Sequence, residues 1–227
     1  MKLCAKGAAR QYFRNSKGSN VFYAVESTDL ELEGGSLTAV LGRSGSGKST
    51  LLNMMAGLLK PTLGTVELDG TDIYALSDAE RSRLRNERFG IIPQGQTALL
   101  SLTVMENVLL PVEMYGGDVL GRKNKALELL TKLGIERLSG VYPADLSGGE
   151  MRRLAIARAL INDPSVILAD EPTGDLDDEN TAEVLGILRS LADKGAAVLL
   201  VTHENDAVSY ADRVFRMAEG RLSEFTE

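Results

Sequence analysis

Cysteine, long apolar runs and basic clusters are scarce in this chain, and each scarcity excludes a class of protein. One cysteine, Cys4, occurs among the 227 residues, so no disulfide can form within the chain, which suits a reducing compartment. The longest unbroken apolar stretch, residues 196–201, is far shorter than a membrane-spanning helix. The N-terminus carries no apolar segment typical of a signal peptide. We therefore expect a cytosolic chain that reaches a membrane through a partner or through weak surface contact.

The charge balance also excludes a class of ligand. The formal net charge is −7, and no dense group of lysines and arginines is present. A protein that binds the phosphate backbone of a nucleic acid needs a basic surface, so we expect no nucleic-acid partner. The hydrophobic content of 44% is sufficient for a full core, in one large domain or two small ones.

The most informative motif is a complete G-x-x-x-x-G-K-[ST] phosphate loop. It lies between an apolar run at 36–41, predicted to be a buried strand, and a predicted helix over 49–59. Glycines let successive N–H groups point into one concavity, at the positive end of the helix dipole. Lys48 is expected to reach the β- and γ-phosphates, and the Ser49 hydroxyl to bind Mg²⁺. The motif consists of Gly42, Arg43, Ser44, Gly45, Ser46, Gly47, Lys48 and Ser49, with Thr50 next.

Hydrophobic periodicity predicts an α/β core interrupted by helices. Buried strands at 166–169 and 197–201 flank a predicted helix at 178–192, which gives a βαβ unit and hence a parallel sheet. The segment that precedes the strand at 166–169 has a helical pattern, so we expect a helical insert at roughly 95–163. Further strands are predicted at 3–13, 21–32, 65–68, 88–92, 214–217 and 221–225, with a polar turn at 14–19 and a helix at 77–85.

Two further segments carry polar groups suited to a nucleotide. Asp170 and Glu171 end an apolar strand, where a metal and a polar substrate would compensate their charge; alone, the pair could equally be two solvated acids. Asp170 fits a Mg²⁺ ligand, and Glu171 is placed to polarise an attacking water. The segment 146–150, Leu-Ser-Gly-Gly-Glu, opens a helix and is either a second anion site or an ordinary N-cap. A second site makes sense if two copies of the chain enclose two nucleotides head to tail.

Taken in order, these motifs resemble those of the ATP-binding cassette (ABC) ATPases over nearly the whole chain. Gln94 looks like the glutamine that touches Mg²⁺ and the attacking water in that family. Residues 174–177, which end at Asp177, look like the D-loop at the dimer interface. His203, the single histidine, looks like the switch residue at the γ-phosphate. Tyr12 looks like the aromatic that stacks on adenine, with Phe13 as the fallback.

The resemblance implies a fold and a division of the chain. It implies one ABC ATPase domain over 1–227, with a phosphate-loop NTPase core of parallel sheet (1–94 and 164–227), an antiparallel β subdomain and a helical subdomain at roughly 95–163. It implies ATP and Mg²⁺ as ligands, with Lys48, Gln94, Glu171 and His203 as catalytic groups.

The resemblance also implies partners. A second copy of the chain is expected to complete the γ-phosphate shell with the residues Ser147, Gly148 and Gly149. Residues 89–94, 102–108 and 169–174 look like the subfamily for lipoprotein release, macrolide and antimicrobial-peptide export, and cell division. Its members act on a membrane permease, so we expect a location on the inner face of the membrane. Departures from the usual pattern occur at Arg43, Pro93, Glu150 and Asp175.

Several alternatives remain open at this point. The ATPase domain could power an exporter, or it could belong to a cell-division regulator that acts on a cell-wall hydrolase through a membrane partner. A soluble ABC protein of DNA repair or translation usually has a coiled-coil insertion or two cassettes, and this chain has neither. A module that binds without hydrolysing is disfavoured by Glu171 and His203. The leucines Leu99, Leu100 and Leu102 either pack inside the helical part or form a groove for a permease helix.

Overall fold

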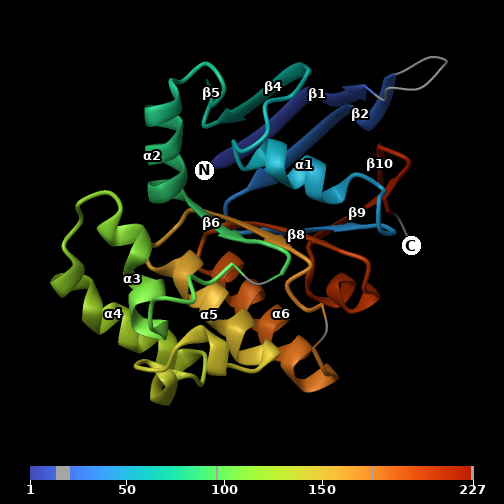
Figure 1. The fold of residues 1–227 in the computed structure, drawn as a ribbon. Helices are drawn as coiled ribbons and strands as arrows, with labels where there is room; N and C mark the ends of the chain where they lie inside the picture. The colour runs from blue at the N-terminus through green and yellow to red at the C-terminus, as the bar shows by residue number, and fades with distance from the viewer. Residues whose placement is uncertain (14–20, 96, 175, 226–227) are drawn as a thin grey trace.

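Two sheets and a layer of helices make up the chain in a computed structural model, which describes residues 1–13, 21–95, 97–174 and 176–225 (Figure 1). The strands are β1 (Lys2–Phe13), β2 (Val21–Glu33), β3 (Leu37–Leu41), β4 (Leu63–Leu68), β5 (Thr71–Asp72), β6 (Phe89–Ile92), β7 (Val166–Asp170), β8 (Ala197–Thr202), β9 (Arg213–Ala218) and β10 (Arg221–Glu224). The helices are α1 (Lys48–Met55), α2 (Asp78–Arg88), α3 (Val104–Glu113), α4 (Val119–Lys132), α5 (Gly148–Leu160) and α6 (Asp178–Asp193), with short 3₁₀ turns at Glu136–Leu138, Pro143–Asp145 and Asn205–Tyr210.

The two sheets differ in strand direction. The smaller sheet has the order β2-β1-β4-β5 and is antiparallel throughout. The larger has the order β10-β9-β3-β8-β7-β6, in which only the β10–β9 pair is antiparallel. The strands β7 and β8 are parallel neighbours joined through α6, as the βαβ pattern predicts. The predicted α/β class, with its parallel and antiparallel parts, is confirmed.

The central strands are apolar on both faces because both faces of the large sheet are covered. Every residue of β3, β7 and β8 is buried. On one face, Val40 and Val201 pack in a core with α1 and the small sheet. On the other face, Ala39 and Leu200 pack against the helices α3 to α6, which lie beneath the sheet in Figure 1. This continuous burial is what a sheet covered on both sides requires.

Local chemistry explains where some elements begin and end. The helix α2 begins after Ser77, whose side chain forms a reciprocal capping box with Glu80. The predicted helix over 49–59 was too long, because α1 ends at Met55 and Ala56 caps it. Gly57 follows with a φ of 69°, in the left-handed region that ends helices. The predicted turn at 14–19 lies outside the described residues.

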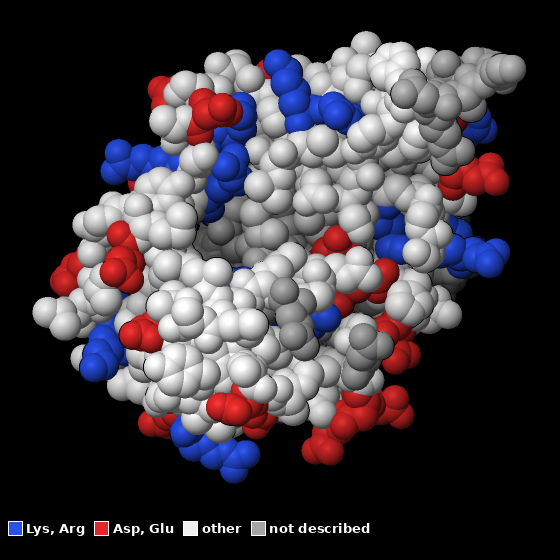
Figure 2. Space-filling view, viewed as in Figure 1, with Lys and Arg blue, Asp and Glu red and all other residues white. Residues whose placement is uncertain are grey.

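No helix in the described parts of the chain is long and apolar enough to cross a membrane. Figure 2 shows acidic and basic side chains interspersed over the face that is seen in Figure 1, with acidic groups gathered at the lower right.

Candidate functional site

The phosphate loop connects β3 to α1, and its glycines are required by close backbone neighbours. A Cβ on Gly47, whose φ is 110°, would lie 2.2 Å from the carbonyl oxygen of Ala24. A Cβ on Gly42 would lie 2.4 Å from the carbonyl oxygen of Met217. Gly45, with a φ of 77°, faces open space instead. The loop is therefore held tightly from behind and is open in front, as a cradle for an anion must be.

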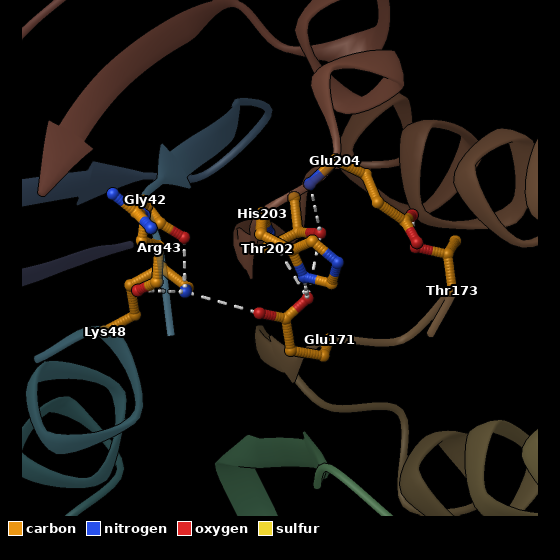
Figure 3. A network of polar contacts seen from close by, with 8 residues as sticks. All are labelled: Gly42, Arg43, Lys48, Glu171, Thr173, Thr202, His203 and Glu204. Atoms are coloured by element: carbon orange, nitrogen blue, oxygen red, sulfur yellow. Dashed lines mark hydrogen bonds and ion pairs between the residues drawn. The ribbon is translucent and has the colours of Figure 1, made fainter. Parts of the chain in front are cut away.

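Lys48 is the first residue of α1 and is 5% exposed. Its Nζ donates to the carbonyl oxygens of Gly42, at 2.6 Å, and Arg43, at 3.3 Å. The same Nζ lies 3.3 Å from Oε1 of Glu171 (Figure 3). The lysine is thus folded back over its own loop, and its charge is matched by a carboxylate from the far half of the chain.

Glu171 directly follows β7 and is held on two sides. Its φ of 47° is unusual for a residue with a side chain. Its Oε2 accepts from the Thr202 hydroxyl at 3.1 Å and the His203 N–H at 3.3 Å, and lies 2.9 Å from His203 Nδ1. Burial would raise the pKa of Glu171, but the hydrogen bonds from His203 and Thr202 and the charge of Lys48 hold this pKa below its usual value. Glu171 is therefore kept ionised, as a base must be.

Asp170, the last residue of β7, is buried and poorly satisfied. Among the described residues, its Oδ1 finds no hydrogen-bond partner. Burial raises the pKa of this carboxyl, and a hydrogen bond with Ser49 opposes the change only in part. A buried carboxyl group with an unpartnered oxygen beside the Ser49 hydroxyl fits a hard cation such as Mg²⁺, which prefers oxygen ligands.

A second set of contacts joins the segment after β7 to the segment after β8. The buried Thr173 donates its hydroxyl hydrogen to the Glu204 carboxylate. The Glu204 N–H donates to the Thr202 Oγ1 at 3.1 Å (Figure 3). Since Thr202 also contacts Glu171, these bonds fix the two carboxyl ends of neighbouring parallel strands relative to each other.

Lys48, Glu171 and His203 line one pocket of about 490 Å³, which gathers half of the predicted site residues but not Asp170. From the phosphate loop and α1, it is lined by Ser44, Gly45, Gly47, Lys48, Ser49 and Thr50. Gln94, Glu171 and His203 line it from elsewhere in the chain. Sequence reasoning missed five lining residues: Phe22, Tyr23, Ala24, Glu219 and Gly220. The last two are held by contact with the loop, since the Gly220 N–H donates to the Ser46 carbonyl at 2.9 Å.

The aromatic side of the pocket differs from the predicted one. Phe22 lines the pocket, and the Tyr12 ring stacks on it with centroids 5.7 Å apart and planes inclined by 25°. The Arg10 guanidinium lies 4.9 Å from the centroid of Tyr12. Phe13, the fallback, is 76% exposed. The pairing of Tyr12 with Phe22 across the β1–β2 hairpin is the signal that could have found Phe22.

The segment 146–150 lies apart from this pocket's lining. Ser147 caps α5, and its side chain forms a reciprocal capping box with Glu150, whose Oε2 accepts from the Ser147 N–H at 2.9 Å. Gly148 and Gly149 form the first turn of the helix. Asp177 caps α6 by accepting from the Asn180 N–H at 2.9 Å. The departure at Asp175 lies outside the described residues.

A model of the family described as "ABC transporter" matches residues 25–174, which is more than half of the chain. The chain belongs to the ABC transporter family. It contains an ABC ATPase domain, a domain that binds and hydrolyses ATP. The expectation drawn from the motifs at 42–50, 146–150 and 170–171 is confirmed at this level.

Relatives of this ABC cassette agree with the assignment. It is 39% identical to "Lipoprotein-releasing system ATP-binding protein LolD" of Xanthomonas axonopodis pv. citri, over 97% of this chain and 89% of the relative. It is 41% identical to "Macrolide export ATP-binding/permease protein MacB 1/2" of Paracoccus denitrificans, over 96% of this chain. The cassette spans about a third of the length of the MacB relatives that it matches, 32% and 31%.

A solved structure shares the whole fold. The cassette superposes with a TM-score of 0.89 on the "Dimeric structure of a post-hydrolysis state of the ATP-binding cassette MJ0796 bound to ADP and Pi". The sequence identity is 33%, and the match covers 99% of both chains. That neighbour is therefore a dimer with hydrolysed nucleotide, on the same fold as this cassette.

Proposed function

We propose that this chain is the ATP-hydrolysing, nucleotide-binding part of a membrane exporter of the lipoprotein-release, macrolide or antimicrobial-peptide type. The observation that carries the proposal is the network in Figure 3, where Lys48 of a complete phosphate loop and His203 both contact the Glu171 carboxylate. The division into a core (1–94 and 164–227) and a helical subdomain (95–163) is part of this proposal.

The residues of the pocket suit distinct roles. The N–H groups of 42–49 hold the phosphates, and Lys48 neutralises the β- and γ-phosphates. Ser49, Asp170 and Gln94 would hold Mg²⁺, which supplies Lewis-acid stabilisation of phosphate charge. Phe22 and Tyr12 form the stacked aromatic side that suits the adenine ring.

Glu171 is proposed as the general base and His203 as the contact to the γ-phosphate. As the water oxygen bonds to the γ-phosphorus, Glu171 takes a proton from that water. The bond from the γ-phosphorus to the bridging oxygen breaks, which leaves ADP and inorganic phosphate. Lys48 and His203 both contact the Glu171 carboxylate. A triphosphate that attracts these two groups frees the base at the moment when it is needed.

A second copy of the cassette is proposed to complete each site. The dimeric neighbour supports this pairing. Ser147 and the N–H of Gly149 lie at the start of α5, apart from the pocket of their own chain, and suit a γ-phosphate held by a partner copy. Asp177 is proposed at the edge of the same interface.

A membrane permease is the proposed mechanical partner, and it would hold the cassette at the inner face of the membrane. The names of the LolD and MacB relatives support a transporter setting. Leu99 and Leu100 are 46% and 64% exposed, which favours their role as a docking rim for a permease segment over internal packing. Both the permease partner and the class of exported substrate are proposals.

The test is ATP turnover of the purified chain, measured against protein concentration, with Glu171→Gln beside it. The substitution keeps the size of the side chain but removes the base, so the rate is expected to fall by about 10²–10⁴. ATP binding is expected to persist. Turnover that rises faster than linearly with concentration would support the two-chain site. An unchanged rate in Glu171→Gln would exclude Glu171 as the base.

A further inference from the structure

The segment that carries Gln94 leaves the large sheet abruptly. The β6 ladder ends at the pair Ile92–Ala169. Pro93 comes next, and proline has no N–H to continue a ladder. Gln94 nevertheless lines the pocket beside Lys48 and Glu171. Some part of the molecule other than the sheet must therefore set the position of Gln94.

Two arginines of α5 hold the backbone on both sides of Gln94. Arg152 Nη1 donates to the Pro93 carbonyl oxygen at 3.0 Å. Arg158 Nη1 donates to the Thr97 carbonyl oxygen at 2.8 Å, and its Nη2 donates to the Thr97 hydroxyl. The contacts therefore bracket Gln94 in the sequence, and both come from one helix.

The Arg158 side chain is partly buried in the helical layer, and it reaches out to the exposed Thr97. Burial lowers the pKa of the Arg158 guanidinium. Hydrogen bonds that involve a charged group are stronger than neutral ones. The neighbouring Leu99 is held by the helical layer too, because its N–H donates to the buried Asn107 of α3 at 2.8 Å. Pro93, Thr97 and Leu99 are thus each fastened to a helix.

We infer that Arg152 and Arg158 are positioning residues that fasten the Gln94 segment to the helix beginning at Ser147. The inference rests on the proposed function, because it concerns how Gln94 serves ATP hydrolysis. An α-helix is a stiff rod, so a movement of α5 carries both of its attachments with it. One placement of α5 therefore sets two things together. It brings Gln94 to the phosphates of its own chain, and it presents Ser147 to the partner copy.

The experiment is a double-mutant cycle on ATP turnover. Arg158→Gln is expected to lower kcat on the order of tenfold, because a charged donor to the Thr97 backbone is lost. The affinity for ATP is expected to change less than twofold. In a Gln94→Ala background the same substitution is expected to change kcat less than twofold, because the arginine acts through Gln94. Arg152→Gln is expected to lower kcat as well, but only in part through Gln94, because the Arg152 charge also acts on the Asp170 carboxyl. Arg158→Lys is expected to recover part of the rate lost in Arg158→Gln.

A control and a second readout separate positioning from loss of folding. Arg122→Gln removes an exposed arginine of α4 that pairs with Asp163, and it is expected to leave kcat unchanged. Hydrogen–deuterium exchange of the free chain is expected to rise at 97–103 in Arg158→Gln, and to stay unchanged in Arg122→Gln.

Three results would overturn the inference. They are equal losses of kcat in the Gln94 and Gln94→Ala backgrounds, an unchanged kcat in both arginine variants, and unchanged exchange at 97–103. A wild-type chain without turnover would contradict the proposed function instead. The exchange measurement needs no nucleotide and would then decide the inference by itself.

Discussion

Replacing Asn107 by alanine tests how the helical layer holds the segment that follows Gln94. Asn107 lies on α3 and is 0% exposed. Its Oδ1 accepts from the Leu99 N–H at 2.8 Å. Its Nδ2 lies 3.0 Å from each of three carbonyl oxygens, those of Leu99, Leu102 and Thr103. One side chain therefore satisfies the backbone of a whole irregular segment.

The expected cost follows from these contacts. A net contribution of about 1 kcal/mol for each hydrogen bond gives a loss of about 3–4 kcal/mol for Asn107→Ala. This is a large share of the 5–15 kcal/mol or so that stabilises a typical domain. At roughly 2–4 °C per kcal/mol for a chain of this size, Tm is expected to fall by about 6–16 °C.

Thermal and urea unfolding of the free chain measure this loss. Asn162→Ala is the matched control, because the partly buried Asn162 donates to the Asn86 carbonyl at 3.0 Å in the single contact described for its side chain. It is expected to cost about 1 kcal/mol. A loss below about 1 kcal/mol in Asn107→Ala, or one equal to that of Asn162→Ala, would refute the reasoning.

Three further predictions concern the phosphate loop, Asp170 and the exposed Asp212. Gly47→Ala would place a Cβ 2.2 Å from the Ala24 carbonyl oxygen, so we expect loss of nucleotide binding in a fluorescent-ATP titration, whereas Gly140→Ala, with nothing within 4 Å of its Cβ, should bind normally. Asp170→Asn should raise the Tm of the free chain, because burial raises the pKa of Asp170 and disfavours its ionised form, yet it should abolish turnover; a lower Tm would contradict this. Burial would raise the pKa of Asp212, but Arg189 and the Leu37 N–H hold this pKa below the usual 3.8. The contribution of Asp212 to stability is therefore present above pH 3.8 and is lost as the pH falls further. In Asp212→Asn the free energy of unfolding should depend less on pH in this acidic range.

The sequence by itself determined the parts of the site that depend on neighbouring residues. The phosphate loop could be identified from the sequence because its function needs glycines and a lysine at fixed spacing. These residues lie within one short stretch, between a strand and a helix. The place of Asp170 and Glu171 followed from an apolar strand that ends in acids. The order of strands and helices, and the parallel pairing of β7 and β8, followed from periodicity and the handedness of βαβ units.

Only the tertiary structure decided which distant groups meet. Phe22 lies against the pocket because the hairpin pairs it with Tyr12. Lys48 meets Glu171 because β3 and β7 flank β8 in one sheet. The arginines of α5 reach the Gln94 segment because the helical layer folds back under β6. Such contacts depend on how packed layers bring distant side chains together. A local pattern of residues does not determine which distant residues come into contact.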